Sequence, residues 1–220
     1  YNLISEASCV GPVSAQKCVS TDELNTAGAS SDLASLGVPE WAMSSVKSVP
    51  DKDRQLEGLI AASSWDFDPT ATPTEILRSL VEGSAAKYEA TGILTAGSGV
   101  GMSPYQLLVA ASLVEREALP ADMAKVARVI VNRLAVDQPL QFDSTVNYAL
   151  GKSDLQLSAE ELKTDSPYNT YVNKGLPPGP INSPGEAAMT AVLNPAKGDW
   201  LYFVTTDPES KTTEFATTYD

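Results

Sequence analysis

Residues 107–118 read Leu-Leu-Val-Ala-Ala-Ser-Leu-Val-Glu-Arg-Glu-Ala, an apolar run that ends in two closely spaced glutamates. The apolar residues recur every three or four positions, which predicts a helix with one face in the protein core. Glu115 and Glu117 flank that face on opposite sides, because a helix turns by about 100° per residue. We therefore expect this helix to organise the fold and to carry acidic groups at the edge of the core.

The chain of 220 residues contains no histidine. This excludes Ser-His-Asp and Cys-His catalysis, and also metal sites of the His-Glu-x-x-His type. Acid/base chemistry near neutral pH then depends on a carboxyl group whose pKa is raised by its surroundings. A glutamate on an apolar helix fits that description, and the alternative is that both acids form an ordinary solvated helix flank.

The residues one turn upstream distinguish the two glutamates. A helical side chain leans toward the preceding turn, where Glu117 meets Leu113 and Val114. Glu115 has only two small residues there. Desolvation should therefore raise the pKa of Glu117 more and suit it to donate a proton. Glu115 is better suited to accept hydrogen bonds from a neighbouring loop, as a buried cap or in a salt bridge.

Helix-start and turn patterns elsewhere predict an α+β fold. Capping boxes with proline at the first helical position begin helices at 72–75 and 103–106. A third helix with one buried face is expected over 123–134. The remaining segments are a short strand and turn over 56–67, a turn-rich stretch over 138–185, and a terminal hairpin formed by 201–204 and 214–217.

The formal net charge is −13, from 28 acidic and 15 basic residues. That balance repels polyanions, so neither nucleic acid nor an anionic membrane surface is an expected partner. No cofactor or metal ion is expected either, because the chain lacks histidine and a phosphate-binding glycine loop. Cys9 and Cys18 share one short loop and predict a disulfide outside a reducing compartment, with two free thiols as the alternative.

Several motifs along the chain form one combination. They are Leu56-Glu57-Gly58, Val114-Glu115-Arg116-Glu117-Ala118, Val131-Asn132-Arg133-Leu134, Leu140-Gln141-Phe142-Asp143-Ser144-Thr145-Val146, Ser166-Pro167-Tyr168-Asn169-Thr170-Tyr171, Gly175-Leu176-Pro177-Pro178-Gly179-Pro180-Ile181 and Leu201-Tyr202-Phe203-Val204. From residue 54 onwards the chain resembles the YceG-like (MltG) family of endolytic murein transglycosylases. One departure is Ala61-Ala62-Ser63-Ser64-Trp65, where that family commonly has Phe-Pro-Asp-Thr-Tyr.

The resemblance implies how the chain is organised. Residues 51–220 would form the catalytic domain, a helical core with a lysozyme-like glutamate helix, a turn-rich cleft wall and a C-terminal β-hairpin. Residues 1–50 would be a small N-terminal appendage or the remnant of a LysM-like module. The longest apolar stretch, 107–114, is too short to span a membrane. The resemblance implies an N-terminal transmembrane anchor, expected outside this chain, which would hold the domain on the extracytoplasmic side of the bacterial cell membrane.

The resemblance also implies a reaction, in which the β-1,4 bond between MurNAc and GlcNAc in peptidoglycan is cut and 1,6-anhydro-MurNAc ends form. Glu117, the second glutamate of the pair, would be the general acid/base, in agreement with the packing argument. Its supporting residues would be Glu115, Gln141 and Asp143. Asp143 would act as a loop cap rather than as a nucleophile. The residues that contact the glycan would be Tyr168, Asn169, Tyr171 and Pro178. Tyr168 also suits a place in the core.

Two other functions fit the same residues. A muramidase would hydrolyse the same bond with Asp143 as a second carboxylate. A non-catalytic cell-wall binding or scaffold module would keep the fold for partner contacts alone. Peptidoglycan glycan strands are the expected partner, and cell-wall synthases at the membrane are candidate protein partners.

Overall fold

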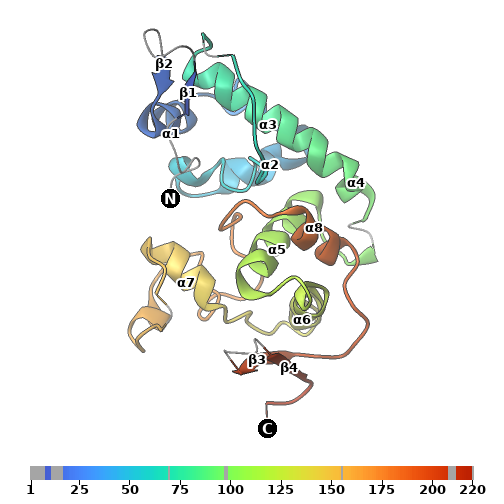
Figure 1. Ribbon diagram of the computed structural model, residues 1–220. Helices are drawn as coiled ribbons and strands as arrows, with labels where there is room; N and C mark the ends of the chain where they lie inside the picture. The colour runs from blue at the N-terminus through green and yellow to red at the C-terminus, as the bar shows by residue number, and fades with distance from the viewer. Residues whose placement is uncertain are drawn as a thin grey trace.

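Helices dominate the structure, a computed structural model that describes residues 8–10, 17–68, 70–96, 99–154, 156–207 and 212–219. The elements are, in chain order, β1 (Ser8–Val10), β2 (Lys17–Val19), α1 (Thr21–Ser30), α2 (Glu40–Ser48), the 3-10 helix η1 (Lys52–Arg54), α3 (Pro73–Ala90), α4 (Ile93–Ala96), α5 (Pro104–Glu117), α6 (Met123–Ala135), α7 (Asp143–Leu150), the 3-10 helix η3 (Glu161–Lys163), α8 (Glu186–Leu193), β3 (Tyr202–Asp207) and β4 (Thr212–Ala216). Figure 1 shows α1 to α3 at one end of the molecule, the β3–β4 hairpin at the other, and α5, α6 and α8 between them. Both sheets are two-stranded and antiparallel, so the observed class is mostly helical α+β.

Helix α5 is the central element of the core. Every residue from Leu107 to Val114 is buried, and the helix packs against α2, α4, α6, α7 and α8. It is therefore surrounded by protein on all sides rather than on one face. The polar residue in this run, Ser112, is satisfied within the protein. Its hydroxyl donates to the Val109 carbonyl at 2.7 Å and accepts from the Ile181 N–H at 3.1 Å.

Both predicted capping boxes form. The side chains of Thr72 and Ser103 each accept a hydrogen bond from the backbone N–H three residues later. The side chain at that later position accepts in turn from the backbone N–H of the cap residue. The third predicted helix, α6, begins at Met123 and buries one face as expected. A further capping box at Ser20 begins α1 and was not predicted. Local sequence signals thus fix the starts of α3 and α5 correctly.

The short strand predicted over 56–67 does not form. Turns follow η1 instead, and they bury Leu56, Leu59 and Ile60. These positions stand at i, i+3 and i+4, which is the spacing of a helical turn rather than of a strand. Gly58 has φ +72° here, and a Cβ at this position would lie 2.5 Å from the Pro180 side chain. The Leu-Glu-Gly motif therefore forms a tight turn that lets the segment before α8 pack closely.

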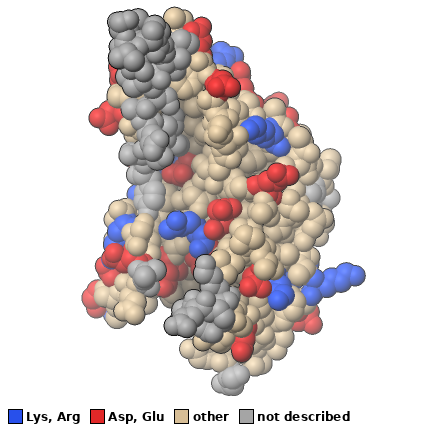
Figure 2. Space-filling view, in the orientation of Figure 1, with Lys and Arg blue, Asp and Glu red and all other residues tan. Residues whose placement is uncertain are grey.

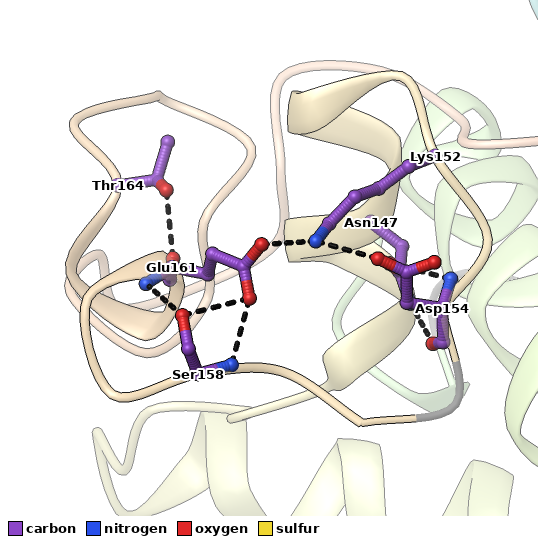
Figure 3. A network of polar contacts seen from close by, with 6 residues as sticks. All are labelled: Asn147, Lys152, Asp154, Ser158, Glu161 and Thr164. Carbon is purple, nitrogen blue, oxygen red and sulfur yellow. Dashed lines mark hydrogen bonds and ion pairs between the residues drawn. The ribbon is translucent and has the colours of Figure 1, made fainter.

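The turn-rich stretch over 138–185 contains a helix, α7, that the sequence patterns did not predict. A network of polar contacts fixes its C-terminal end, as Figure 3 shows. Lys152 Nζ pairs with the carboxylates of Asp154, at 2.7 Å, and Glu161. The Asn147 side chain exchanges two hydrogen bonds with the backbone of Asp154. These contacts hold the loop after α7 against the helix, so α7 has a defined place beside α5.

The predicted terminal hairpin is present and is tied to the end of α6. Asn132 Nδ2 donates to the carbonyls of Gly198 and Trp200 at 3.1 and 2.9 Å. Arg133 is buried, and its Nε donates to the Leu201 carbonyl at 2.6 Å. Its Nη1 donates to carbonyls of the 139–140 turn. The Asn-Arg pair therefore joins the hairpin to the helical core.

The described part of residues 1–50 packs on the same core as the rest of the chain. Leu24 of α1 and Val46 of α2 belong to one buried cluster that also includes residues of α3, α5, α6 and α8. Cys9 and Cys18 are partners in the register of β1 and β2. Their side chains lie outside the described residues, so the disulfide stays a prediction, as does the division of the chain at residue 50.

The molecular surface carries charges of both signs. On the face shown in Figure 2, acidic and basic side chains are interspersed, so the net negative charge does not gather into one patch there. Across the described ranges, no helix combines the length and apolar character needed to cross a membrane. Within the same ranges, no three potential metal-ligand side chains (His, Cys, Asp or Glu) come together in a way that could hold a metal ion.

Candidate functional site

The candidate site lies where α5 ends and α7 begins. Glu117 is the last residue of α5, because Ala118 is extended and closes the helix. The Glu117 side chain is half-buried and meets the first turn of α7, where the Ser144 hydroxyl donates to its Oε1. In Figure 1 α7 lies beside the C-terminal half of α5, which brings these two helix ends together.

Burial is the main reason that the pKa of Glu117 is raised above its ordinary value. The negative charge of Asp143 raises it further, while the hydroxyl and N–H of Ser144 and the charge of Arg116 act in the opposite direction. The helix ends add to this balance, because the carboxyl group lies at the negative end of α5 and the positive end of α7. The direction is the one predicted from Leu113 and Val114, which are both fully buried.

Asp143 and Tyr171 lie beside this glutamate. The Tyr171 hydroxyl donates to Asp143 Oδ1 at 2.5 Å, and the Asp143 side chain is exposed at the first position of α7. Burial, Asp143 and the charge of Glu117 all raise the pKa of the Tyr171 hydroxyl, which therefore stays protonated. The structure thus brings together four side chains: Glu117, Ser144, Asp143 and Tyr171.

Glu115 has a different role. Its Oε2 accepts a hydrogen bond of 3.1 Å from the N–H of Gly185, the residue that caps the N-terminus of α8. This confirms the prediction that Glu115 accepts hydrogen bonds from a neighbouring loop. The bond joins the C-terminal turn of α5 to the start of α8, so Glu115 holds the helix that presents Glu117.

Two of the predicted glycan contacts are buried in the structure. Tyr168 packs its ring against Tyr148, with the centroids 4.8 Å apart, and is 1% exposed. Asn169 is fully buried, and its side chain bonds to the backbone of Leu162, Thr164 and Tyr171. The assignment of these two residues to substrate binding is therefore corrected, because neither presents a surface to a ligand. For Tyr168 the core-packing alternative fits the structure.

Two further predicted residues on the turn segments are accessible, Gln141 from the supporting set and Pro178 from the predicted glycan contacts. Gln141 is exposed with φ +55°, and its N–H donates to the Thr170 carbonyl at 3.0 Å, which places it on the same segment as Asp143. Pro178 is half-buried in a turn whose Gly179 packs against the Tyr105 hydroxyl near the start of α5. Glu117 lies at the other end of that helix, so Pro178 belongs to a different part of the surface.

A cavity of about 550 Å³ lies beside Gly185. It is lined by Ala61, Ala62 and Ser63, by the end of α3 and by one side of α8. The segment that departs from the family pattern therefore forms a wall of this cavity. Neither Glu115 nor Glu117 is among the residues that line it.

Ser144 is the site residue that the sequence patterns missed. It is 27 positions from Glu117 in the chain, and nothing local to either residue connects them. The available signal was the run Asp143-Ser144-Thr145, since small polar and acidic residues favour the start of a helix. Recognition of α7 would have placed this serine in a first helical turn.

The fold and the site together define a mostly helical protein in which burial raises the pKa of the Glu117 carboxyl group where α5 meets α7. The chain belongs to the YceG-like family, whose family model matches residues 8–220. Over 92% of its length it is similar, with a TM-score of 0.73 and 30% identity, to the crystal structure of a yceG-like protein from Listeria monocytogenes, of which it covers 66%.

Two curated relatives carry the name endolytic murein transglycosylase. The protein of Bacillus subtilis (strain 168) is 40% identical over 151 residues, which are 68% of this chain and 41% of that protein. The protein of Streptococcus pneumoniae serotype 2 is 33% identical over 176 residues, which are 76% of this chain and 32% of that protein. The chain thus spans less than half the length of these relatives.

Proposed function

We propose that this chain is an endolytic lytic transglycosylase that cuts the MurNAc–GlcNAc β-1,4 bond within peptidoglycan glycan strands. The observation that carries the proposal is the raised pKa of Glu117 at the junction of α5 and α7. A carboxyl group that stays protonated nearer to neutral pH can act as a general acid. The names of the Bacillus and Streptococcus relatives support the substrate and the reaction.

One titratable group is enough for this chemistry. Protonated Glu117 would give its proton to the glycosidic oxygen as the bond from that oxygen to C1 of MurNAc breaks. The Glu117 carboxylate would then take the proton of the C6 hydroxyl of the same sugar, while O6 bonds to C1 and closes a 1,6-anhydro ring. The attacking hydroxyl is already held by the sugar, so the ring closes without recruiting water.

Asp143 supports an alternative, muramidase-type hydrolysis. It lies close enough to Glu117 to raise its pKa, and glycoside hydrolases use two carboxylates around the scissile bond. Its Oδ1 accepts from the Tyr171 hydroxyl, which favours a role in holding Tyr171 rather than in attack. The two reactions give different products, because hydrolysis leaves reducing ends and transglycosylation leaves anhydro ends.

The exposed residues around Glu117 are the proposed glycan contacts. Tyr171 offers a half-buried ring on which a sugar can pack, and Gln141 offers an exposed amide for sugar hydroxyls. Residues 51–220 would carry the catalysis, with residues 1–50 as an N-terminal appendage. The place of action would be the extracytoplasmic side of a bacterial membrane, held there by an anchor outside this chain. Cell-wall synthases are proposed protein partners.

Digestion of purified peptidoglycan by this chain, followed by mass spectrometry, tests the proposal. Anhydro ends are one water lighter than reducing ends, so the spectrum separates the two reactions. Glu117→Gln should abolish the anhydro products while the protein stays folded. Glu160→Gln is the matched control, since Glu160 is exposed and pairs only with Lys163 across one turn. New reducing ends would establish the muramidase, and product formation by the Glu117 variant equal to wild type would refute the assignment of the acid. If glycan strands bind without being cut, a non-catalytic wall-binding module is the remaining explanation.

A further inference from the structure

The Ser144 hydroxyl is aimed at one oxygen of the Glu117 carboxyl group. It donates to Oε1, and Ser144 stands at the second position of α7, where backbone N–H groups point out of the helix. We infer that Ser144 is the positioning residue of this site: its hydroxyl fixes Oε1, so that Oε2 is the oxygen that donates and recovers the proton. The inference rests on the proposed function of Glu117 as the general acid/base.

The chemistry of the pair assigns the proton. Oε1 accepts from Ser144 Oγ, and in the part of the chain that the structure describes no other hydrogen bond of this hydroxyl is found. A proton on Oε1 would compete with the serine proton for the same space. The Ser144 N–H is a second donor to the same carboxyl group. Because the hydroxyl takes Oε1, the protonated form of Glu117 carries its proton on Oε2, the oxygen that faces the glycosidic bond in this proposal.

The same contact helps the second half of the reaction. When Oε2 gives its proton to the glycosidic oxygen, Glu117 becomes a carboxylate in a half-buried place, which is unfavourable by itself. A hydroxyl that already points at Oε1 stabilises the new charge without rearrangement. The carboxylate then accepts the C6 hydroxyl proton at Oε2, and the starting state is restored.

The serine can position Glu117 because its own helix is fixed at both ends. At the start of α7, Thr145 Oγ1 donates to the Phe142 carbonyl at 2.6 Å, and the Phe142 N–H donates to Thr170 Oγ1 at 3.0 Å. Thr145 and Thr170 also share a hydrogen bond of 2.9 Å, and both are buried. At the other end the Lys152 network holds the following loop, as in Figure 3.

Two isosteric variants isolate the hydroxyl. Ser144→Thr keeps the hydroxyl donor. Ser144→Val has the same shape as the threonine variant but lacks the hydroxyl. The first measurement is the pKa of the Glu117 carboxyl group, followed by NMR through the chemical shift of its carboxyl carbon. Glu117→Gln is used to assign the signal. Because the serine stabilises the ionised form, Ser144→Val should raise this pKa, and Ser144→Thr should restore it. Ser48→Ala is the control, since Ser48 is exposed on α2 and its hydroxyl only bonds the Ser45 carbonyl.

Turnover is the second measurement. In Ser144→Val, kcat for anhydro product formation should fall ~10-fold with little change in KM, which is less than the 10²- to 10⁴-fold typical for loss of a general acid itself. The alkaline limb of the pH–rate profile should move to higher pH with the carboxyl titration. An unchanged Glu117 titration in Ser144→Val, or a Thr variant that behaves like the Val variant, would overturn the inference. Failure of the proposed function gives a different result, because Glu117→Gln would then remain active whatever the titration shows.

Discussion

Asn169→Ala should destabilise the protein strongly, although asparagine in a turn-rich cleft wall is typical of a sugar contact. The side chain is fully buried and makes three hydrogen bonds to backbone groups. Its Nδ2 donates to the carbonyls of Leu162 and Thr164 at 3.1 and 2.9 Å, and its Oδ1 accepts from the Tyr171 N–H at 2.9 Å. Alanine would leave these three partly buried backbone groups without this partner.

The magnitude follows from those bonds. At a net contribution of about 0.5–1.5 kcal/mol each, their loss should lower the free energy of unfolding by roughly 2–4 kcal/mol. For a chain of this size that corresponds to a fall in melting temperature of about 4–16 °C. Turnover should fall too, because the Asn169 side chain holds the backbone of Tyr171, so activity alone does not separate the two roles of Asn169.

Thermal and urea unfolding followed by circular dichroism are the decisive assays. Asn173→Ala is the matched control, because Asn173 lies one turn away, is exposed, and bonds only the carbonyls of Ser166 and Asn169. Its cost should stay near 0.5 kcal/mol, as for most surface substitutions. If Asn169→Ala kept the wild-type melting temperature and lost turnover, the structural explanation would be wrong and the residue would be a substrate contact.

Four other outcomes are expected. Glu117→Gln should raise the melting temperature at neutral pH, because the folded-state pKa of Glu117 lies above 4.5 and ionisation there disfavours the fold; the gain should disappear as the pH falls below that value, and equal melting temperatures at every pH would contradict it. Glu115→Gln should retain more turnover than Glu117→Gln, because its amide oxygen can still accept from Gly185; an inactive Glu115 variant beside an active Glu117 variant would reverse the two roles. Cys9 and Cys18 should resist alkylation in the unreduced protein, and their reduction should cost at most about 2–3 kcal/mol and leave turnover intact; labelling of both thiols would refute the disulfide. Dialysis against a strong chelator should leave activity unchanged, and a loss that a divalent ion restores would show that a metal is needed.

The helices that the sequence predicts best are those whose signals are local. The capping boxes at Thr72 and Ser103 begin α3 and α5 because the bonding groups stand three residues apart. By contrast, α7 is short and polar at its start, and its neighbours are turns, so periodicity does not reveal it. The strand predicted over 56–67 failed because buried residues in successive turns can imitate a short alternating pattern.

The same distinction applies to the site. The raised pKa of Glu117 was predicted from residues one helical turn away, and the structure agrees with that direction. Ser144 could not be chosen in this way, since its contact with Glu117 depends on how two helices meet. Asn169 was misassigned because an asparagine that satisfies buried backbone and one that binds a sugar look identical in sequence.

The hydrogen bonds that join the end of α6 to the hairpin affect the order in which the chain can fold during synthesis. Arg133 Nε finds its acceptor, the Leu201 carbonyl, 68 residues further along the chain. At about 5–20 residues per second, a ribosome needs roughly 3–14 seconds to extend the chain that far. During this interval the guanidinium can reach the carbonyls of the 139–140 turn, but its Nε still lacks the Leu201 carbonyl and keeps its water, because burying part of a charged group without its partner is unfavourable. The last turn of α6 therefore settles into the core only after the hairpin strand has emerged, so a nascent chain stopped before that point should remain incompletely packed.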